Sequence, residues 1–260
     1  MNLLQIAVRI AAMPIESIRH KGGKFDMEVF RDLEEFRMLE YAHSTLQQID
    51  GGTGSSRAAF IFSSGKVLKI AKEKKWGGDL DAGVAQNEYE VDLYTSPKTK
   101  PIVAKIFDSA ADFVWIISEL VRPIKDWAEW KSLTGSDLKE ALNLAESASW
   151  DGVHEVNDEW IDNYYQELSS NHNRTQVDRS QDPVSPDMIN LIISVLDQGL
   201  AVSDLSRSGQ WGKTSSGRVV LLDYGASESI LEEHYEEHSE SELTSYDGDQ
   251  EGEDQNADEV

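Results

Sequence analysis

The apolar run VLKIA contains one lysine, Lys69, whose ammonium group has the chemistry to bind a phosphate or a carboxylate. In a buried strand this group is costly to desolvate unless an anion pairs with it, whereas at a strand edge it reaches water. Glu88 and Glu90, on the helix expected next, are the carboxylates in range. We favour Glu90, because Leu93 and Tyr94 follow it by three and four residues and share its inward face.

Two aspartates follow apolar segments in the second half of the chain. Asp204 comes after a buried helix, in AVSDLS, and Asp223 ends the strand RVVLL just before Tyr224 and Gly225. A carboxylate at the end of a buried strand is suited to Mg²⁺, which prefers hard oxygen ligands. An aspartate in an ordinary turn needs no ligand, so neither residue alone predicts a metal site.

A glycine-rich segment, IDGGTGSSRAAF, lies between two strand-like runs. Its glycines Gly51, Gly52 and Gly54 would let the backbone approach phosphate oxygens and direct N–H groups at them. A tight turn also needs glycine, and the segment is no Walker loop, because no Gly-Lys-Ser/Thr and no helix follow.

The elements that must position these side chains follow from periodicity. The run FIFSSGKVLKIA predicts a hairpin that turns at Ser64-Gly65, DAGVAQNEYEVDLYTS a helix ended by Pro97, and PIVAKIF and FVWIISELV two more strands. Residues 27–48 predict one helix, with an apolar stripe from Val29 to Leu46. From Trp127 onward the pattern is helical until the strand before Asp223.

These patterns predict an α+β protein in four parts: a helical extension over 1–45, a β-rich part over 46–121, a mainly helical part over 122–238 and a disordered tail over 239–260. The tail expectation rests on charge. The 260 residues carry 48 acidic and 24 basic side chains, a net charge of −24. Residues 228–260 hold 14 of the acidic residues and no Lys or Arg. We expect the negative side chains of this segment to repel one another and the segment to bury little apolar surface.

Composition excludes several classes of protein. The acidic balance argues against general nucleic-acid binding and against docking on anionic lipid. The absence of cysteine excludes disulfides and thiolate metal sites. No apolar run is long enough for a membrane span, and we read the first 20 residues as a helix rather than a signal peptide. A cytoplasmic protein is expected.

The order of these motifs along the chain resembles that of the protein-kinase-like superfamily, which includes small-molecule phosphotransferases. The motifs are the glycine loop, the strand lysine, the helix glutamate, the strand pair, Asp204 and LLDYGAS. The resemblance covers residues 46–227 and implies a two-lobed fold that binds ATP and Mg²⁺. Gly52 and Gly54 would cover the phosphates, Ala59 and Val67 would line the adenine pocket, and Glu119 to Val121 would form the hinge that reads adenine. Lys69, held by Glu90, would pair the phosphates, Asp204 would act as catalytic base, and Asp223 would bind the metal.

The sequence departs from that family at several places, among them Ser203, where protein kinases have Arg before the catalytic Asp. Arg57 replaces the third glycine of the loop. The second metal ligand, usually an Asn, is Gly209, although Gln210 could reach in if the loop carries one extra residue. Residues 226–238 leave no room for an activation segment or for the helices that dock peptide substrates.

Two functions therefore stay open. One is a minimal phosphotransferase that acts on an unknown acceptor, and the other is a pseudokinase or interaction module that binds a protein partner through the acidic tail and the N-terminal helix. The short body, abundant Asp and absence of Cys would suit a bacterial or bacteriophage protein, in the latter case in the host cytoplasm.

Overall fold

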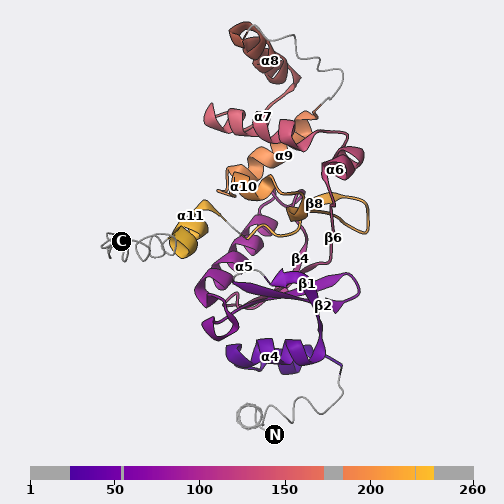
Figure 1. The fold of residues 1–260 in the computed structure, drawn as a ribbon, viewed down its shortest axis with the longest axis vertical. Coiled ribbons are helices and arrows are strands. Elements are labelled where there is room, and N and C mark those ends of the chain that lie inside the picture. Colours follow the sequence, from indigo (N-terminus) through magenta and orange to yellow (C-terminus); the bar gives the residue numbers. More distant parts are fainter. Residues whose placement is uncertain (1–23, 54–55, 173–183, 226, 237–260) are drawn as a thin grey trace, which may run out of the picture.

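A computed structural model describes residues 24–53, 56–172, 184–225 and 227–236. It confirms a mixed α and β protein with an antiparallel sheet. In Figure 1 the sheet lies across the lower part of the molecule, with helix α4 (Glu35–Thr45) on one side and helix α5 (Leu80–Thr95) on the other, and the helices from Trp127 to Leu196 are stacked beyond α5. The predicted tail over 239–260 lies outside the described residues.

The main sheet has five strands in the order β1-β2-β3-β5-β4, and all neighbours are antiparallel. The strands are β1 (Gln47–Thr53), β2 (Arg57–Ser63), β3 (Lys66–Ala71), β4 (Ile106–Ser109) and β5 (Trp115–Glu119). The hairpin predicted at Ser64-Gly65 joins β2 to β3, and Gly65 adopts a φ of 83°, which a side chain disfavours. The run PIVAKIF was predicted as strand, but only its last two residues belong to β4.

Alternation along the strands gives the sheet two different faces. Leu68 in β3 pairs with Phe60 in β2 and with Ile117 in β5, and all three side chains are buried in one apolar cluster. Lys69, the next residue, pairs with Ala59 and lies on the opposite face. The sheet therefore buries one face in that cluster and presents Lys69 towards α5.

The apolar face is covered by α3 (Met27–Arg31) and α4 (Glu35–Thr45). The single helix predicted over 27–48 is wrong, because α3 ends at Arg31 with Asp32 as its C-cap, α4 begins at Glu35 with Glu34 as its N-cap, and β1 starts at Gln47. The break turns Phe30 and Leu39 into the core and leaves Phe36, a member of the predicted stripe, 38% exposed. Both helices pack in the same cluster as the sheet.

Helix α5 (Leu80–Thr95) crosses the other face of the sheet. Its N-cap is Asp79, whose side chain accepts a hydrogen bond from the Ala82 N–H at 3.2 Å. A Cβ at Gly83 would lie 2.8 Å from the Cβ of Ala71, so this glycine allows α5 to approach β3 closely. The close approach brings the carboxyl-bearing face of α5 against Lys69.

The second half of the chain is mainly helical, as predicted. It contains α6 (Trp127–Thr134), α7 (Leu138–Trp150), α8 (Asp158–His172), α9 (Pro186–Leu196) and the short α10 (Val202–Leu205). A small antiparallel sheet is formed by β6 (Arg122–Pro123), β7 (Trp211–Lys213) and β8 (Val219–Leu221), with the turn η2 (Ser208–Gln210) before β7. Trp130 and Trp211 meet at the centre of a second apolar cluster, with ring centroids 4.4 Å apart.

The segment before β4 joins this second cluster to the site. The N–H of Ala104 donates to the Leu221 carbonyl, and the N–H of Leu221 donates to Ile102, at 2.8 and 2.7 Å. The chain leaves β8 at this point and enters Asp223. It then continues into α11 (Glu228–Leu231) and the short π-helix η3 (Glu232–Glu236), which lie beside α5 (Figure 1).

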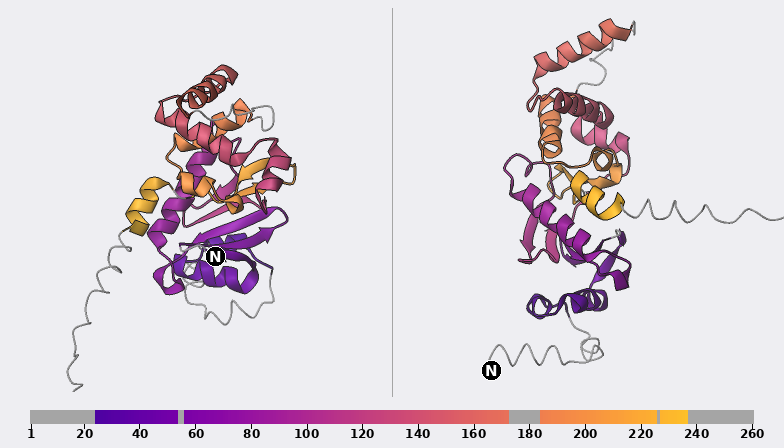
Figure 2. Two further views of the ribbon diagram at one scale, coloured as in Figure 1. Left: turned by 45° about the horizontal axis from the view of Figure 1, so that its top comes forward. Right: turned by 90° about the vertical axis from the view of Figure 1, so that its left-hand side faces the viewer.

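Figure 2 shows from two further sides that α4 and α8 lie at opposite ends of the molecule, with the sheet and α5 between them. None of the helices in the described ranges combines the length and the apolar character that a membrane crossing requires.

Candidate functional site

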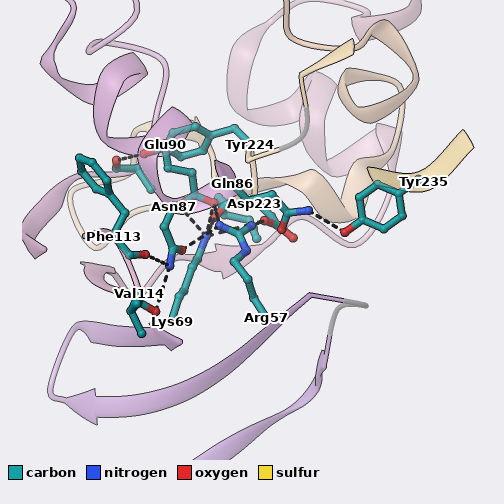
Figure 3. Close-up of polar contacts among 12 residues, drawn as sticks. Arg57, Lys69, Gln86, Asn87, Glu90, Phe113, Val114, Asp223, Tyr224 and Tyr235 are labelled. Atoms are coloured by element: carbon teal, nitrogen blue, oxygen red, sulfur yellow. Dashed lines mark hydrogen bonds and ion pairs between the residues drawn. The ribbon is translucent and has the colours of Figure 1, made fainter. Parts of the chain in front are cut away.

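Lys69 and Glu90 form a buried ion pair where α5 crosses β3 (Figure 3). The Lys69 ammonium nitrogen lies 2.7 and 2.9 Å from the two carboxylate oxygens of Glu90, and it also donates to the Leu222 carbonyl at 3.1 Å. Glu90 is fully buried, whereas Glu88 is exposed on the same helix. The partner of Lys69 is thus Glu90, as the side-chain periodicity of α5 predicts.

Arg57, the first residue of β2, enters the same cluster. Its Nη1 donates to Glu90 Oε1 at 2.7 Å, and its Nη2 donates to Asp223 Oδ1. Arg57 is 8% exposed. Burial acts to lower the pKa of its guanidinium, but the charges of Glu90 and Asp223 outweigh this effect and raise it. Sequence reasoning treated Arg57 only as a replaced glycine and missed this contact.

Asp223 is the exposed member of the cluster. About half of its side-chain surface (49%) reaches solvent, while its Oδ1 lies 3.7 Å from the Lys69 ammonium nitrogen. Loss of hydration acts to raise the pKa of the Asp223 carboxyl, but the charges of Arg57 and Lys69 together hold it below its ordinary value. Asp223 therefore carries a negative charge at neutral pH and has a side open to a ligand.

Further side chains hold Arg57 in place. Asn87, fully buried one turn before Glu90, accepts from Arg57 Nη1 at 3.3 Å and donates to the Phe113 carbonyl at 2.8 Å. On the other side, Ser56 hydrogen-bonds the hydroxyl of Tyr235 in η3, which also accepts from Gln86 at 2.9 Å. Figure 3 shows Asn87 and Gln86 beside the guanidinium, with Tyr235 beyond Gln86.

The two residues after Asp223 fit this arrangement. Tyr224 is buried, donates its hydroxyl to the Ala104 carbonyl at 2.8 Å, and has its ring centroid 5.9 Å from the Lys69 ammonium nitrogen. Gly225 faces Arg57, and a Cβ there would lie 2.9 Å from both terminal nitrogens of the guanidinium. Gly225 thus provides the space that the guanidinium fills.

Of the residues expected around adenine, Ala59 and Val67 share the sheet face of Lys69, whereas Glu119 pairs with Lys66 on the other face. Ala59 pairs directly with Lys69 and is half-buried, and Val67, two residues before Lys69, is buried. Glu119 ends β5, where its N–H donates to the Lys105 carbonyl at 2.8 Å. Val121, also buried, follows it at the junction with β6.

Other predicted residues are placed only by their backbone. Gly52 lies within β1, and Gly54 is outside the described residues. Asp204 lies in α10, and its side chain is outside the described part. Gln210 in η2 accepts from the Leu222 N–H through its carbonyl at 2.9 Å, one residue before Asp223. The structure therefore brings Lys69 into contact with both Glu90 and Asp223. It also hydrogen-bonds the backbone of Gln210 to Leu222, the residue before Asp223.

This arrangement is a charge cluster of two cations and two carboxylates rather than a ready metal centre. Within the described ranges, no three His, Cys, Asp or Glu side chains gather closely enough to hold a metal ion among themselves. Asp223 has the exposed carboxylate oxygen that Mg²⁺ prefers, and Mg²⁺ is often held by one or two carboxylates plus substrate phosphates. The donor set therefore fits a metal ion that arrives with a phosphate-bearing ligand.

Comparisons with known proteins do not assign this site. The sequence matches no protein-family model, and a search of curated proteins finds none with significant similarity.

Proposed function

We propose that the chain is a kinase-like, two-lobed protein that binds ATP with Mg²⁺ between the five-stranded sheet and the helical half. The observation that carries this proposal is the contact of Lys69 with both Glu90 and Asp223, three residues from a strand, a helix and the end of another strand. In the proposed complex the Lys69 ammonium group pairs the nucleotide phosphates while Glu90 holds it in place. Asp223 would hold Mg²⁺ together with phosphate oxygens.

The sheet face beside Lys69 supports the position of the base. Ala59 and Val67 present small, apolar side chains there. The segment from Glu119 to Val121 runs between the two halves of the chain, where its backbone would read adenine. Phosphoryl transfer needs positioning and charge neutralisation rather than covalent chemistry by the protein, and the lysine and the metal would supply both. Asp204 would orient the acceptor hydroxyl.

Thermal unfolding tests the nucleotide site. ATP and GTP are added with and without Mg²⁺ or Mn²⁺ to the parent and to Asp223→Ala. A ligand at a hundredfold excess over its Kd stabilises the folded state by about 2.7 kcal/mol. We expect metal-dependent stabilisation in the parent and its loss in Asp223→Ala. The matched control is Asp151→Ala, which removes an exposed aspartate in the helical half. Equal stabilisation of Asp223→Ala would show that the metal site is misassigned.

The Arg57 contact favours a second candidate, a pseudokinase that binds a partner and transfers no phosphate. A cation pairs with the carboxylate assigned to the metal, and the usual second metal ligand is missing from the sequence. On this alternative, Lys69→Met retains a protein partner, and removal of residues 239–260 weakens capture of basic partners in a salt-dependent manner. Transfer or hydrolysis of ATP γ-phosphate that Asp204→Asn abolishes would exclude it.

A further inference from the structure

The guanidinium of Arg57 is divided between two carboxylates. One terminal nitrogen donates to Glu90 and the other to Asp223. Glu90 has a second cation, because Lys69 contacts both of its oxygens. Loss of Arg57 would therefore leave Glu90 paired and would chiefly release Asp223.

Arg57 is held in this position by the fold. Asn87 accepts from the same nitrogen that contacts Glu90, and Gly225 leaves open the volume in which both terminal nitrogens lie. The neighbouring residue, Ser56, is buried and contacts Tyr235 in η3. A guanidinium that donates to three side chains and fills the space beside Gly225 is part of the site, whereas an exposed surface arginine would sample many rotamers.

A metal ion at Asp223 would be repelled by the positive charge of that guanidinium. Arg57 and Lys69 both lie against Oδ1 of Asp223, so this oxygen already faces two positive charges. A divalent cation that joined them would bring two more charges close to the same carboxylate, and like charges at this range repel strongly in a partly buried site. The half of the Asp223 side chain that is exposed gives the cation a path of approach.

We infer that Arg57 and a divalent cation are alternative partners of Asp223, so that Arg57 determines how much metal the site requires. The inference rests on the metal role of Asp223 in the proposed function. When the cation binds, the Asp223 contact of Arg57 is released while its contacts with Glu90 and Asn87 remain. Arg57 is thus a residue that tunes metal affinity, at a place where the loop would otherwise carry glycine.

The test titrates Mn²⁺ alone into the full chain and follows the paramagnetic broadening of the backbone amide signals of residues 222–225. The variants are Arg57→Gln, Arg57→Lys and Asp223→Asn. Arg57→Gln removes the competing charge, and we expect half-maximal broadening at about two- to fivefold lower Mn²⁺ than in the parent, the range that one partly exposed ion pair supports. A lysine cannot contact both carboxylates as the planar guanidinium does. The half-maximal Mn²⁺ concentration of Arg57→Lys should therefore lie between those of the parent and Arg57→Gln. Asp223→Asn should abolish the local broadening.

Arg57→Gln broadening at the same or a higher Mn²⁺ concentration than the parent would overturn the inference, and so would broadening that persists in Asp223→Asn. The acidic tail is present in every variant, so its own metal binding cancels from the comparison. If Arg57→Gln does not unfold cooperatively, the comparison is made with Arg57→Lys instead. A half-maximal Mn²⁺ concentration of Arg57→Lys that is no lower than that of the parent then counts against the inference. Thermal stabilisation by ATP is measured separately. If ATP gives no thermal stabilisation but Arg57→Gln still lowers the half-maximal Mn²⁺ concentration, only the nucleotide site is wrong. If ATP stabilises the parent but Arg57→Gln does not lower that concentration, only the role of Arg57 is wrong.

Discussion

Gly225 and Arg57 occupy adjoining space that no larger residue at position 225 could share. A Cβ on Gly225 would lie 2.9 Å from both terminal nitrogens of Arg57 and 2.9 Å from the Cβ of Gln86. Gly225 carries no left-handed φ in this structure, so its need for glycine arises from contact rather than from backbone conformation. Glycine after Asp223-Tyr224 thus has a local physical cause.

A methyl group at position 225 should displace the guanidinium and break the contact with Asp223. We expect Gly225→Ala to lower the free energy of unfolding by about 1–3 kcal/mol, the usual cost of overpacking. Urea denaturation measures this change in the parent and in an Arg57→Ala background. The cost should be smaller in the second background, because the clashing group is gone. Gly209→Ala is the control, since nothing lies within 4 Å of its added Cβ. Equal costs in both backgrounds would contradict the proposed contact.

Glu90 should matter more to stability than either of its cations. Glu90→Gln leaves Lys69 and Arg57 buried with only Asp223 to balance them, and breaking a buried ion pair from one side costs about 3–5 kcal/mol. Lys69→Met should cost less, because Glu90 keeps Arg57. Chemical denaturation gives both values, and Glu88→Gln, at an exposed position on the same helix, should change stability by less than about 0.5 kcal/mol. The reverse order would mean that Lys69 rather than Glu90 is central to the cluster.

The lowered pKa of Asp223 predicts a loss of stability in acid. A carboxyl whose pKa is lower in the folded than in the unfolded state stabilises the fold above its unfolded pKa, close to 3.8. This stabilisation declines as the pH falls from about one unit above 3.8 through the lower, folded pKa. Denaturation from pH 7 to pH 2 should show a shallower acid decline for Asp223→Asn than for the parent. High salt should reduce the difference, because Asp223 is half exposed. If the free energies of unfolding of the parent and of Asp223→Asn declined in parallel with falling pH, the Asp223 carboxyl would make no electrostatic contribution to stability.

Trp211 should contribute to the segment that carries Asp204, whereas its neighbour Trp130 should not. Both indoles are fully buried, and Trp211 donates through Nε1 to the Leu205 carbonyl at 2.8 Å. The Nε1 of Trp130 has no hydrogen-bond partner in the part of the chain that the structure describes. Replacement of each by Phe removes similar volume, so Trp211→Phe should cost about 1–3 kcal/mol more, the penalty for an unpaired buried carbonyl. Hydrogen exchange near Leu205 should rise in that variant only. A similar cost and exchange pattern in both variants would refute this assignment.

Local periodicity was sufficient to select Glu90 over Glu88, to place Lys69 within a buried strand and to place Asp223 just after another. These predictions succeed because the face of a helix and the alternation of a strand follow from nearest neighbours along the chain. The hairpin at Ser64-Gly65 succeeds for the same reason.

The break between α3 and α4 and the role of Arg57 could not be derived in this way. The apolar stripe over 27–48 continues across Asp32, so that periodicity alone favours one helix, while packing on the sheet selects two. The direction of Arg57 depends on Asp223, which lies 166 residues later in the sequence. Buried polar residues such as Asn87 show no sequence signal of their own until such long-range partners are known.

The separation between Arg57 and Asp223 also orders events during synthesis. Lys69, Arg57 and Glu90 are synthesised well over 100 residues before Asp223 and Tyr235. At about 5–20 residues per second, at least several seconds pass between Glu90 and Asp223. During that interval Arg57 and Lys69 have only Glu90 among the carboxylates of the cluster. Only after Asp223 has been synthesised can the cluster reach its balance of two cations and two carboxylates.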